Sequence, residues 1–519
     1  MGRTYKDIYR LTKDKKYIKK AAEAYYTGYL HSNEYYPAIN AASLFLLLED
    51  NDKASKLASE IIKQIADATD YWATVTLGEA WLILGEVEKA KYYYQSAVIA
   101  FQKQFGKFRS TSNQLEFLQE GIDIPDELLE IFPRPNLAVF SGHMIDAPGR
   151  ETKRFPPDIE TEVKEALDKM VDDLDIDIGF TSLASGGDIL FAEVLLERNA
   201  EIKAYLPFRK EDFISTSIAP AGSDWLERFE DSCHVKPKFL TQEPYLETPD
   251  LFNHLGNVMM GECMLLAEQY AVTPFFISVL APSQANKTGG TQELSNIWPF
   301  VDTHHNIDPT QYISIGTRGN EATQTIVSEK EDHDQVDRRM GNILFADIVG
   351  SSKLLREDTP EIILEIFSEM NKIIAPYKNE MFVVNTWGDA IILCHSDTNA
   401  IIEIACAVQE LFMDKKSKKL GLPKGINVRI ALHKGPVFLA EDPLTNEPNV
   451  YGTSINRTAR MEPVTLPGSI YASDQFAATL KLDTGDQFQY QHTGVIELPK
   501  GFGKQEVYRI TRNMDASGS

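Results

Sequence analysis

The chain has 519 residues, with 43% hydrophobic and 25% charged residues, which is typical of globular proteins. This length exceeds what one hydrophobic core normally organises, so we expect about three domains. The formal net charge of -24 would repel a polyanion, and this predicts that nucleic acid is not a partner.

Two further features concern the environment of the chain. The N-terminal residues lack the apolar core of a signal peptide, and no run of about 18 apolar residues follows, so we expect no membrane segment and a cytoplasmic location. The cysteines are widely spaced and contain no C-x-x-C pair, which predicts reduced thiols rather than a metal or redox site: Cys233, Cys263, Cys394 and Cys406.

Residues 1–130 carry apolar positions at helical spacing and predict an all-α helical array. The stretches LLLEDNDKASKLASEII and LILGEVEKAKYYYQSAVI superimpose with Ala54 over Ala90, which indicates at least two helical hairpins. With Leu84-Gly85 and Tyr94, the second hairpin resembles tetratricopeptide repeats. The resemblance implies a groove for a peptide or protein partner, and a helical spacer or dimer-forming element is the alternative.

After Pro133, in residues 131–282, the hydrophobic pattern changes. Short apolar runs alternate with helical segments: LAVFSGH, a helix near 159–174, DIGFTSLASGGD, a helix from Ile189, and EIKAYLPF. This βαβαβ pattern predicts an α/β, doubly wound parallel sheet. Small residues at the strand ends would let backbone amides approach a phosphate, although glycines there can also serve strand-to-helix packing alone.

The same segment resembles SLOG-type Rossmannoid domains through Gly186-Gly187-Asp188, Ala192-Glu193 and Leu206-Pro207-Phe208. The resemblance implies a regulatory, nucleotide-like ligand at the strand ends. The candidate contacts are Ser141, Gly142, Gly186, Gly187 and Asp188, with His143, Asp146 and Arg150 in the following loop.

Residues 283–338 lose periodicity and become rich in polar and acidic residues, so we expect a linker there. His304-His305 is interpreted as a solvated pair rather than a metal site, because no partner cluster accompanies it. Further on, the basic run from Lys415 to Lys419 precedes Gly421, where a helix should end, and we interpret it as stabilising the helix dipole.

Residues 339–512 place two carboxylates at strand ends. The buried-strand pattern at 342–346 ends at Asp347, and two apolar runs, 381–384 and 390–393, flank a bend that contains Asp389. Hard oxygen ligands on stiff strands suit a pair of magnesium ions, whereas either aspartate alone would be read as a turn residue.

The motif YGTSINRTAR completes this pattern. Asn456 and Arg460 are four residues apart and share one helix face. Arg460 is suited to stabilise charge on a transferring phosphoryl group, and Asn456 can hydrogen-bond a ribose oxygen.

The segments LFADIVGSS, NTWGDAIIL, VRIALHKGPV, VYGTSINRTARMEPVTLPGSIYAS and LPKGFGKQEVYRI resemble class III adenylate and guanylate cyclase domains. The resemblance implies a ferredoxin-like α+β fold and a head-to-tail homodimer, with metal ligands from one chain and the catalytic pair from the other. It implies two Mg2+ or Mn2+ ions held by Asp347, Asp389 and the Ile348 carbonyl, Asn456 and Arg460 as the transition-state pair, and Lys500 on the triphosphate. His433 is expected to be structural.

The resemblance implies conversion of a nucleoside triphosphate to a 3',5'-cyclic nucleotide and pyrophosphate. The base-selecting positions hold Asn385 and Asn449. At the position of Asn385 the family usually has Lys or Glu, and at the position of Asn449 it usually has Asp, Thr or Cys. An amide both donates and accepts hydrogen bonds, so ATP is the default by analogy and GTP or a pyrimidine triphosphate is the alternative.

Two other functions stay open at this point. The cyclase domain could be a degenerate module in a ligand-gated scaffold, although its motif residues are intact. A nucleotide-processing enzyme centred on Gly186-Gly187 is the third possibility, but the usual catalytic residues are not evident there. For the whole chain we expect a cyclase controlled by its upstream domains.

Overall fold

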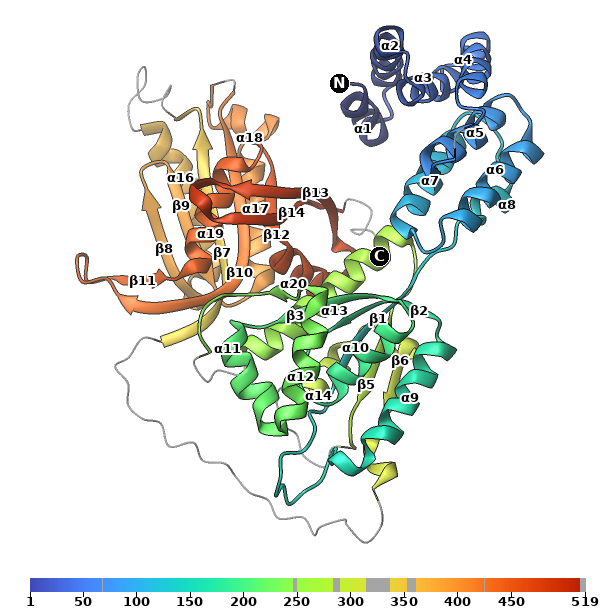
Figure 1. The fold of residues 1–519 in the computed structure, drawn as a ribbon. Coiled ribbons are helices and arrows are strands. Elements are labelled where there is room, and N and C mark those ends of the chain that lie inside the picture. Colours follow the sequence, from blue (N-terminus) through green and yellow to red (C-terminus); the bar gives the residue numbers. More distant parts are fainter. Residues whose placement is uncertain are drawn as a thin grey trace. The chain divides into compact units, whose positions relative to one another are not determined.

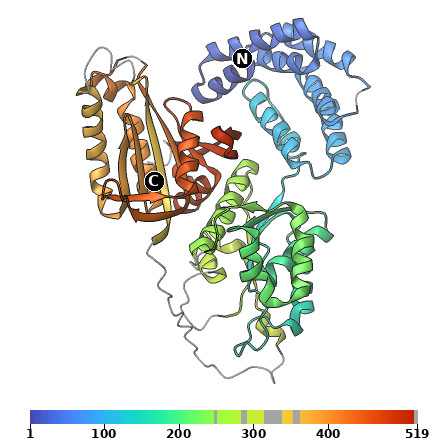
Figure 2. The same cartoon turned by 60° about the vertical axis from the view of Figure 1, so that its left-hand side comes forward.

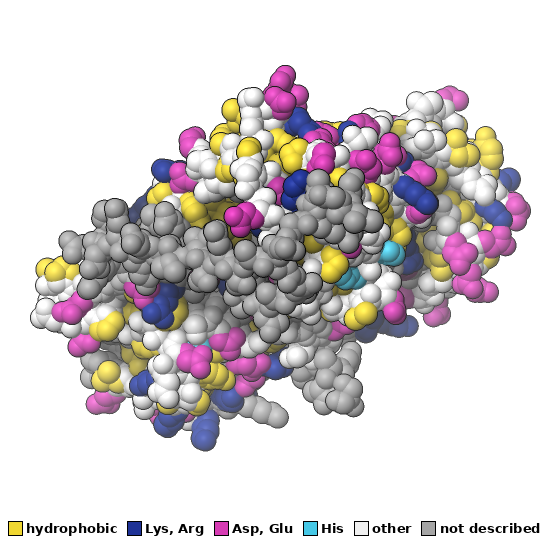
Figure 3. Space-filling model, turned by 90° about the horizontal axis from the view of Figure 1, so that it is seen from below, with side chains coloured by type: hydrophobic (Ala, Val, Ile, Leu, Met, Phe, Trp, Pro, Cys, Tyr) yellow, Lys and Arg dark blue, Asp and Glu magenta, His cyan; other side chains and the backbone are white. Residues whose placement is uncertain are grey.

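The computed structural model describes residues 1–67, 69–245, 250–282, 290–313, 337–351, 361–423 and 425–513. The chain divides into two compact units, Met1–Pro135 and Asn136–Ser519, which are described separately (Figure 1). On the face shown in Figure 3, acidic and basic side chains are interspersed, as expected for an acidic globular protein.

The first unit is helical, which confirms the predicted all-α array. Its helices are α1 (Gly2–Thr12), α2 (Lys15–Ser32), α3 (Tyr35–Leu47), α4 (Asn51–Gln64), α5 (Tyr71–Ile83), α6 (Val87–Ala100), α7 (Phe105–Leu118) and α8 (Asp126–Leu129). Ala54 of α4 and Ala90 of α6 are both fully buried. A Cβ on Gly78 would lie 2.6 Å from the ring of Tyr94, so glycine makes room for this aromatic side chain between α5 and α6.

The second unit begins with a parallel sheet in the order β4-β3-β2-β1-β5-β6. Its strands are β1 (Asn136–Gly142), β2 (Ile176–Thr181), β3 (Glu201–Leu206), β4 (Lys238–Phe239), β5 (Phe275–Val279) and β6 (His304–Ile307). The helices are α9 (Glu160–Asp173), α10 (Gly187–Glu197), α11 (Lys210–Phe213), α12 (Ser223–Ser232), α13 (Asp250–Tyr270) and α14 (Thr291–Ile297). The predicted βαβαβ pattern is confirmed, and the strand order reverses between β1 and β5.

Alternation along β1 gives this sheet two covered faces. Ala138 and Phe140 pack with α9, α10 and α12, whereas Leu137 and Val139 pack with α13. Burial on both sides explains why the strand reads as a continuous apolar run in the sequence.

The predicted linker over residues 283–338 is wrong for its central part. Residues 291–297 form α14, and β6 pairs in parallel with β5 at the sheet edge. His304 is therefore not a solvated loop residue: its ring stacks on Phe276 with centroids 4.8 Å apart and hydrogen-bonds Ser278 Oγ at 3.0 Å. A four-residue edge strand with one buried apolar side chain, Ile307, is too short to show alternation. Residues 283–289 and 314–336 lie outside the described residues.

The C-terminal part is an α+β layer structure. Its sheet follows the order β13-β14-β12-β10-β7-β9-β8, with β11 paired to β10. The strands are β7 (Asp337–Val349), β8 (Met381–Trp387), β9 (Ala390–His395), β10 (Asn427–Glu441), β11 (Pro448–Tyr451), β12 (Ile470–Ser473), β13 (Phe488–Leu498) and β14 (Gly503–Arg512). The helices are α16 (Glu361–Ile374), α17 (Thr398–Leu411), α18 (Asp414–Lys419), α19 (Thr453–Met461) and α20 (Asp474–Thr484), several of which line one face of the sheet in Figure 2.

Alternation along β7 decides which residues reach the free face. Leu344, Ala346 and Ile348 belong to the buried cluster with α16 and α17, whereas Ile343 and Phe345 lie in separate clusters with residues of α19. Asp347 therefore points away from the helix layer. The expected helix end after Lys415–Lys419 is confirmed, because α18 ends at Lys419 with three lysines in its last turn.

The middle and C-terminal parts pack into one unit through α13 and α20. A Cβ on Gly261 of α13 would lie 1.9 Å from the carbonyl oxygen of Ala478 in α20, so only glycine allows this approach. A single buried cluster also runs from the α13 face of the middle sheet into the C-terminal core. Residues expected to form two separate domains thus share one core.

Candidate active site

The two candidate metal ligands lie at adjacent strand ends. Asp347 of β7 pairs with Ala390, the first residue of β9. Asp389 immediately precedes Ala390 in the turn between β8 and β9, which confirms the predicted hairpin. The pairing of β7 with β9 therefore brings the two carboxylates to one edge of the sheet.

Electrostatics at this edge favour a cation. The pKa of Asp347 is raised mainly by burial and further by the Asp389 carboxylate, while Arg429, its register partner on β10, acts in the opposite direction. Ser351 donates a hydrogen bond from Oγ to Asp389 Oδ2 and so orients that carboxylate. Two like charges held this close would gain from a bound divalent ion.

A third carboxylate was missed by the sequence analysis. Glu462, just after α19, is buried and accepts a hydrogen bond from Arg429 Nη1 at 3.3 Å. Burial, followed by the charge of Asp347, raises the pKa of Glu462 to about 7. Its position directly after Arg460-Met461 in the quoted motif is the only sequence signal that could have marked it.

The residues present fit a divalent cation. Among the residues that the structure describes, no group of three or more His, Cys, Asp or Glu side chains is arranged to hold a metal ion. Because Glu462 is bound to Arg429, Asp347 and Asp389 are the carboxylates that would hold a cation, and the contribution of the Ile348 carbonyl stays a prediction. This hard-oxygen set leaves coordination positions for phosphate oxygens, as Mg2+ or Mn2+ sites require.

The structure places the predicted catalytic pair on α19. Asn456 is exposed, whereas Ser454, Ile455 and Thr458 on the other side of the helix are buried. Arg460 lies one turn further on, and its Nε is buried without a hydrogen-bond partner in the described part of the chain. The helix thus presents an amide and an incompletely bonded guanidinium from one region of its surface.

The two candidate base-selecting residues lie on neighbouring strands. Val383 of β8 and Val450 of β11 share a small buried cluster beside Asn385 and Asn449. Asn385 Oδ1 accepts a hydrogen bond from the next backbone amide at 2.8 Å. Asn449 Nδ2 donates to Asp442 Oδ2 at 3.0 Å, so its amide orientation is fixed by a neighbouring carboxylate.

Lys500 lies far from the aspartates within one chain. It is exposed in the connection between β13 and β14, with a positive φ of 62°. In the sheet order, β14, β12 and β10 separate this connection from β7. His433, expected to be structural, is buried and hydrogen-bonded to Ser473 Oγ at 2.8 Å.

The candidate ligand residues of the middle domain meet at the carboxyl end of β1. Gly142 donates its N–H to Asp188 Oδ1 at 3.1 Å, and burial raises the pKa of Asp188 to about 7. A Cβ on Gly186 would lie 2.4 Å from the Ile145 amide nitrogen, and one on Gly187 3.1 Å from Gly142 Cα. The glycines therefore have a demonstrable packing role, and ligand binding by them stays a prediction.

The loop after β1 is internally bonded. Asp146 accepts hydrogen bonds from the Arg154 and Phe155 amides at 2.7 and 2.9 Å, and Arg150 Nε lies 3.2 Å from its other oxygen. Ser141 Oγ bonds Thr291 Oγ1 at 2.9 Å. The His143 ring is mostly buried, which lowers its pKa to about 4, and its Nε2 has no hydrogen-bond partner among the described residues. Arg154 Nε in this loop and Ser185 Oγ beside Gly186 are likewise buried without a hydrogen-bond partner among the described residues, so these atoms and the imidazole nitrogen are open to a further polar group.

Comparison with known families identifies both ends of the chain. Residues 330–512 match the model of the adenylate and guanylate cyclase catalytic domain, and residues 1–48 match the model of Tetratricopeptide Repeats-Sensor. No helix in the described residues has the length and apolarity to cross a membrane.

Curated relatives align over the same C-terminal part. Guanylate cyclase 2G of Rattus norvegicus is 27% identical over 184 residues, covering 33% of this chain and 16% of the relative. Guanylyl cyclase C of Homo sapiens is 29% identical over 188 residues, covering 33% and 17%. The germination-specific adenylate cyclase of Dictyostelium discoideum is 26% identical over 195 residues, covering 34% and 22%. The chain thus spans less than a quarter of the length of each of these relatives.

Solved structures are similar over the same third. The adenylyl cyclase CyaB from P. aeruginosa is 17% identical with a TM-score of 0.31, covering 34% of this chain and 97% of that chain. The guanylate cyclase domain of RhGC from Catenaria anguillulae, in complex with GTP, is 22% identical with a TM-score of 0.29, covering 34% and 99%. By the family models, residues 330–512 form a class III adenylate and guanylate cyclase catalytic domain, and residues 1–48 match tetratricopeptide repeats of the sensor type.

Proposed function

We propose that the chain converts a nucleoside triphosphate, by default ATP, into a 3',5'-cyclic nucleotide and pyrophosphate. The pairing of β7 with the β8–β9 hairpin carries the proposal, since it brings Asp347 and Asp389 to one edge within the matched catalytic domain. Oxygen donors at this edge suit two Mg2+ or Mn2+ ions bound together with the triphosphate.

Each side chain then has a defined task. Asp347, Asp389 and the Ile348 carbonyl hold the ions, which when bound lower the pKa of the ribose 3'-hydroxyl and offset phosphate charge. Arg460 balances the charge that accumulates on the α-phosphate, and Asn456 orients the ribose by a hydrogen bond. Lys500 binds the triphosphate, and no protein nucleophile is required.

The active site is proposed to form between two copies of the chain. Lys500 is separated from Asp347 by three strands, which supports a site assembled from the aspartates of one copy and Asn456, Arg460 and Lys500 of the other. A head-to-tail homodimer satisfies this requirement and yields two equivalent sites.

The choice of base is proposed to depend on the side-chain amides of Asn385 and Asn449. Asn385 and Asn449 on neighbouring strands would face the base in this arrangement, and an amide can satisfy a purine or a pyrimidine edge. In the free chain Asn449 Nδ2 donates to Asp442 Oδ2 at 3.0 Å and its Oδ1 accepts from the Val450 N–H at 2.9 Å, so the base would compete with these two bonds. ATP remains the default by analogy, and GTP or a pyrimidine triphosphate is the alternative.

The upstream parts are proposed to regulate the cyclase. The helical unit would bind a peptide or protein partner, and the middle domain would bind a nucleotide-like ligand through Ser141, Gly142, Gly186, Gly187 and Asp188. Packing of α13 on α20 offers a physical route from the middle domain to the catalytic domain.

The test is to incubate the purified chain with Mn2+ or Mg2+ and ATP, GTP, CTP or UTP separately, and to resolve products by mass. We expect a cyclic product from at least one triphosphate and none from Asp347→Ala at equal protein concentration. Absence of product from all four, with no nucleotide binding, would instead favour a degenerate cyclase in a signalling scaffold.

A further inference from the structure

A segment of the middle domain reaches into the catalytic domain. Residues 238–245, here called the strap, begin with β4 and end before the undescribed residues 246–249. The Leu240 carbonyl accepts a hydrogen bond from Gln475 Nε2 of α20 at 2.9 Å. Gln475 Oε1 in turn bonds His254 Nε2 of α13 at 3.1 Å, so the strap is tied to both packed helices.

Glu243 of the strap caps the helix that carries the catalytic pair. Its Oε1 accepts hydrogen bonds from the Thr453 backbone N–H at 3.1 Å and from Thr453 Oγ1 at 2.7 Å. Thr453 is the first residue of α19, and the cap position before it is Gly452, which has no side chain to bond the free amides. A carboxylate at this end also complements the helix dipole. The cap is thus supplied by a residue 210 positions away in the sequence.

The second oxygen of Glu243 holds the strand of the metal ligands. Arg338, at the start of β7, donates from Nη2 to Glu243 Oε2 at 3.2 Å and from Nη1 to the Pro244 carbonyl at 2.8 Å. Both side chains are buried, with 8% of Glu243 and 9% of Arg338 exposed. A paired and hydrogen-bonded ion pair at this depth fixes geometry, because breaking it leaves one charge unpaired.

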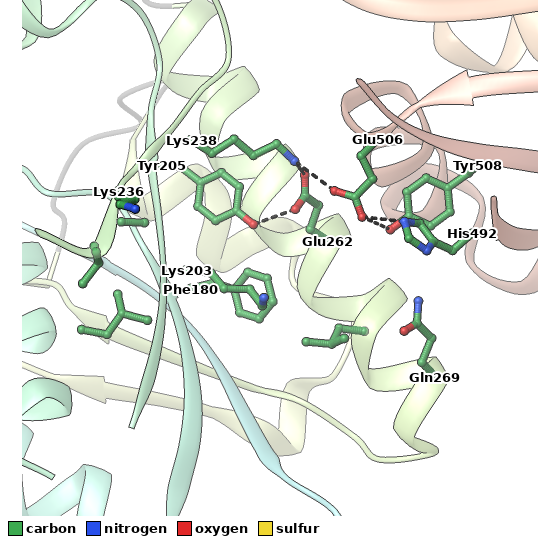
Figure 4. Close-up of a pocket in the computed structure, with 14 residues that line it drawn as sticks. Phe180, Lys203, Tyr205, Lys236, Lys238, Glu262, Gln269, His492, Glu506 and Tyr508 are labelled. Atoms are coloured by element: carbon green, nitrogen blue, oxygen red, sulfur yellow. Dashed lines mark hydrogen bonds and ion pairs between the residues drawn. The ribbon is translucent and has the colours of Figure 1, made fainter. Parts of the chain in front are cut away.

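The strap is anchored at its other end by Lys238 (Figure 4). Lys238 Nζ lies 2.6 Å from Glu262 of α13, contacts Asp474 at the start of α20, and lies 3.8 Å from Glu506 of β14. Tyr205 donates its hydroxyl to Glu262 at 2.6 Å. All of these residues except Asp474 line a pocket of about 320 Å³ between the middle and catalytic parts. A shift of β4 would therefore be passed along the strap to Glu243.

We propose that Glu243 is a positioning residue by which the middle domain sets the placement of β7 and α19. The inference rests on the proposed function, since these two elements carry Asp347 and the Asn456–Arg460 pair. In a head-to-tail dimer they serve opposite active sites, so one carboxylate in each chain adjusts both sites. Catalysis that depends on exact placement of oppositely supplied groups is sensitive to displacements of this kind.

The test compares kcat and KM of the full chain with those of Glu243→Ala and Glu243→Gln, using Mn2+ and the triphosphate that the wild type converts. We expect kcat of Glu243→Ala to fall about tenfold with KM changed less than about twofold, since the capping and pairing bonds position groups that act in the transition state. The kcat of Glu243→Gln should lie between those of the wild type and Glu243→Ala. Its amide oxygen can still accept a hydrogen bond from Thr453, but the neutral side chain no longer forms an ion pair with Arg338. The matched control is Glu227→Gln, an exposed glutamate on α12, which should leave kcat unchanged.

Hydrogen exchange of the amides at 453–461 separates this inference from the cyclase proposal. Faster exchange in Glu243→Ala than in Glu227→Gln is expected whether or not the chain turns over a triphosphate. An active wild type with unchanged kcat in both Glu243 variants would overturn the inference while leaving the cyclase intact. If the wild type is inactive, an exchange rate at 453–461 that is the same in Glu243→Ala as in Glu227→Gln would overturn the inference instead. Melting curves identify a variant that fails to fold. If Glu243→Ala does not fold, the kcat and the amide exchange of Glu243→Gln decide the test.

Discussion

Two carboxylates share one guanidinium at the end of β7. Burial and neighbouring carboxylates raise the pKa of Asp347 and of Glu462, and the charge of Arg429 acts in the opposite direction on both. An excess of negative charge in a half-buried place costs folding free energy unless a cation joins it. The proposed metal ligands should therefore make the domain less stable without an ion, and binding of a divalent ion should stabilise it by mass action, which melting curves with and without Mn2+ would measure.

Arg460 should affect the chemical step rather than substrate binding. We expect Arg460→Lys to lower kcat about 100-fold or more with a small change in KM, because an ammonium cannot reproduce the planar donor pattern on a charged phosphate. Steady-state kinetics across substrate concentrations check this. Arg512→Lys, in an exposed pair with Glu403, is the matched control and should retain activity. A large rise in KM at constant kcat would show that Arg460 serves ground-state binding instead.

Asp188 gives the middle domain a predictable response to pH. Burial raises its pKa to about 7, so the folded state holds this proton more tightly than the unfolded chain does. The associated stability is present below about pH 4 and is lost as the pH rises towards 7. We therefore expect the melting temperature of Asp188→Asn, relative to the wild type, to rise by about 5 °C between pH 5 and pH 8. A difference independent of pH would show that Asp188 titrates normally.

At the scale of elements, a glycine determines how closely the middle and catalytic parts pack. The closest approach of α13 to α20 is at Gly261, where an added Cβ would meet the backbone of Ala478 rather than a movable side chain. Backbone cannot give way as a rotamer can, so the two helices would have to separate.

Gly261→Ala should accordingly loosen the contact between the middle and catalytic parts. We expect its melting temperature to fall by about 5 °C and amide exchange in α13 and α20 to increase, because the shared core opens. Gly28→Ala on α2 is the control, since its Cβ would meet only Pro37 Cβ at 3.6 Å. Equal melting temperatures for both variants and the wild type would mean that α13 and α20 do not pack this closely.

Local patterns explain which elements could be predicted. Apolar runs on both sides of NTWGD predict the β8–β9 hairpin, and continuous short apolar runs predict β1 and β2. β6 could not be found, because its four residues become a strand only by pairing with β5. Glu462 and Glu243 were missed for the same reason: their roles depend on contacts with Arg429 and Thr453, which lie far away in the sequence.

At the scale of the whole molecule, the strap adds two polar anchors to the packing of α13 on α20. Lys238 is anchored between Glu262 and Asp474, and Glu243 joins Arg338 to Thr453. A ligand that moves the middle sheet would thus act on both β7 and α19 of the proposed site. The proposed homodimer belongs to the same scale, since β12 and β10 lie between the β13–β14 connection with Lys500 and β7 with Asp347 in the sheet order.

Complementation tests the shared site directly. Asp347→Ala and Asn456→Ala should each be inactive as homodimers, because each removes a group needed at both sites. A mixed dimer of the two, isolated through two different affinity tags, has one site with both defects and one with neither, so we expect about half of the wild-type activity per dimer. Each variant carried on both tags is the control and should stay inactive. If the mixed dimer forms and remains inactive, the aspartates and Asn456 act within the same chain, and the head-to-tail arrangement is wrong. Recovery of activity would place Asp347 of one chain and Asn456 of the other at the same site, and Glu243, which contacts both β7 and α19 of its own chain, would then influence both sites.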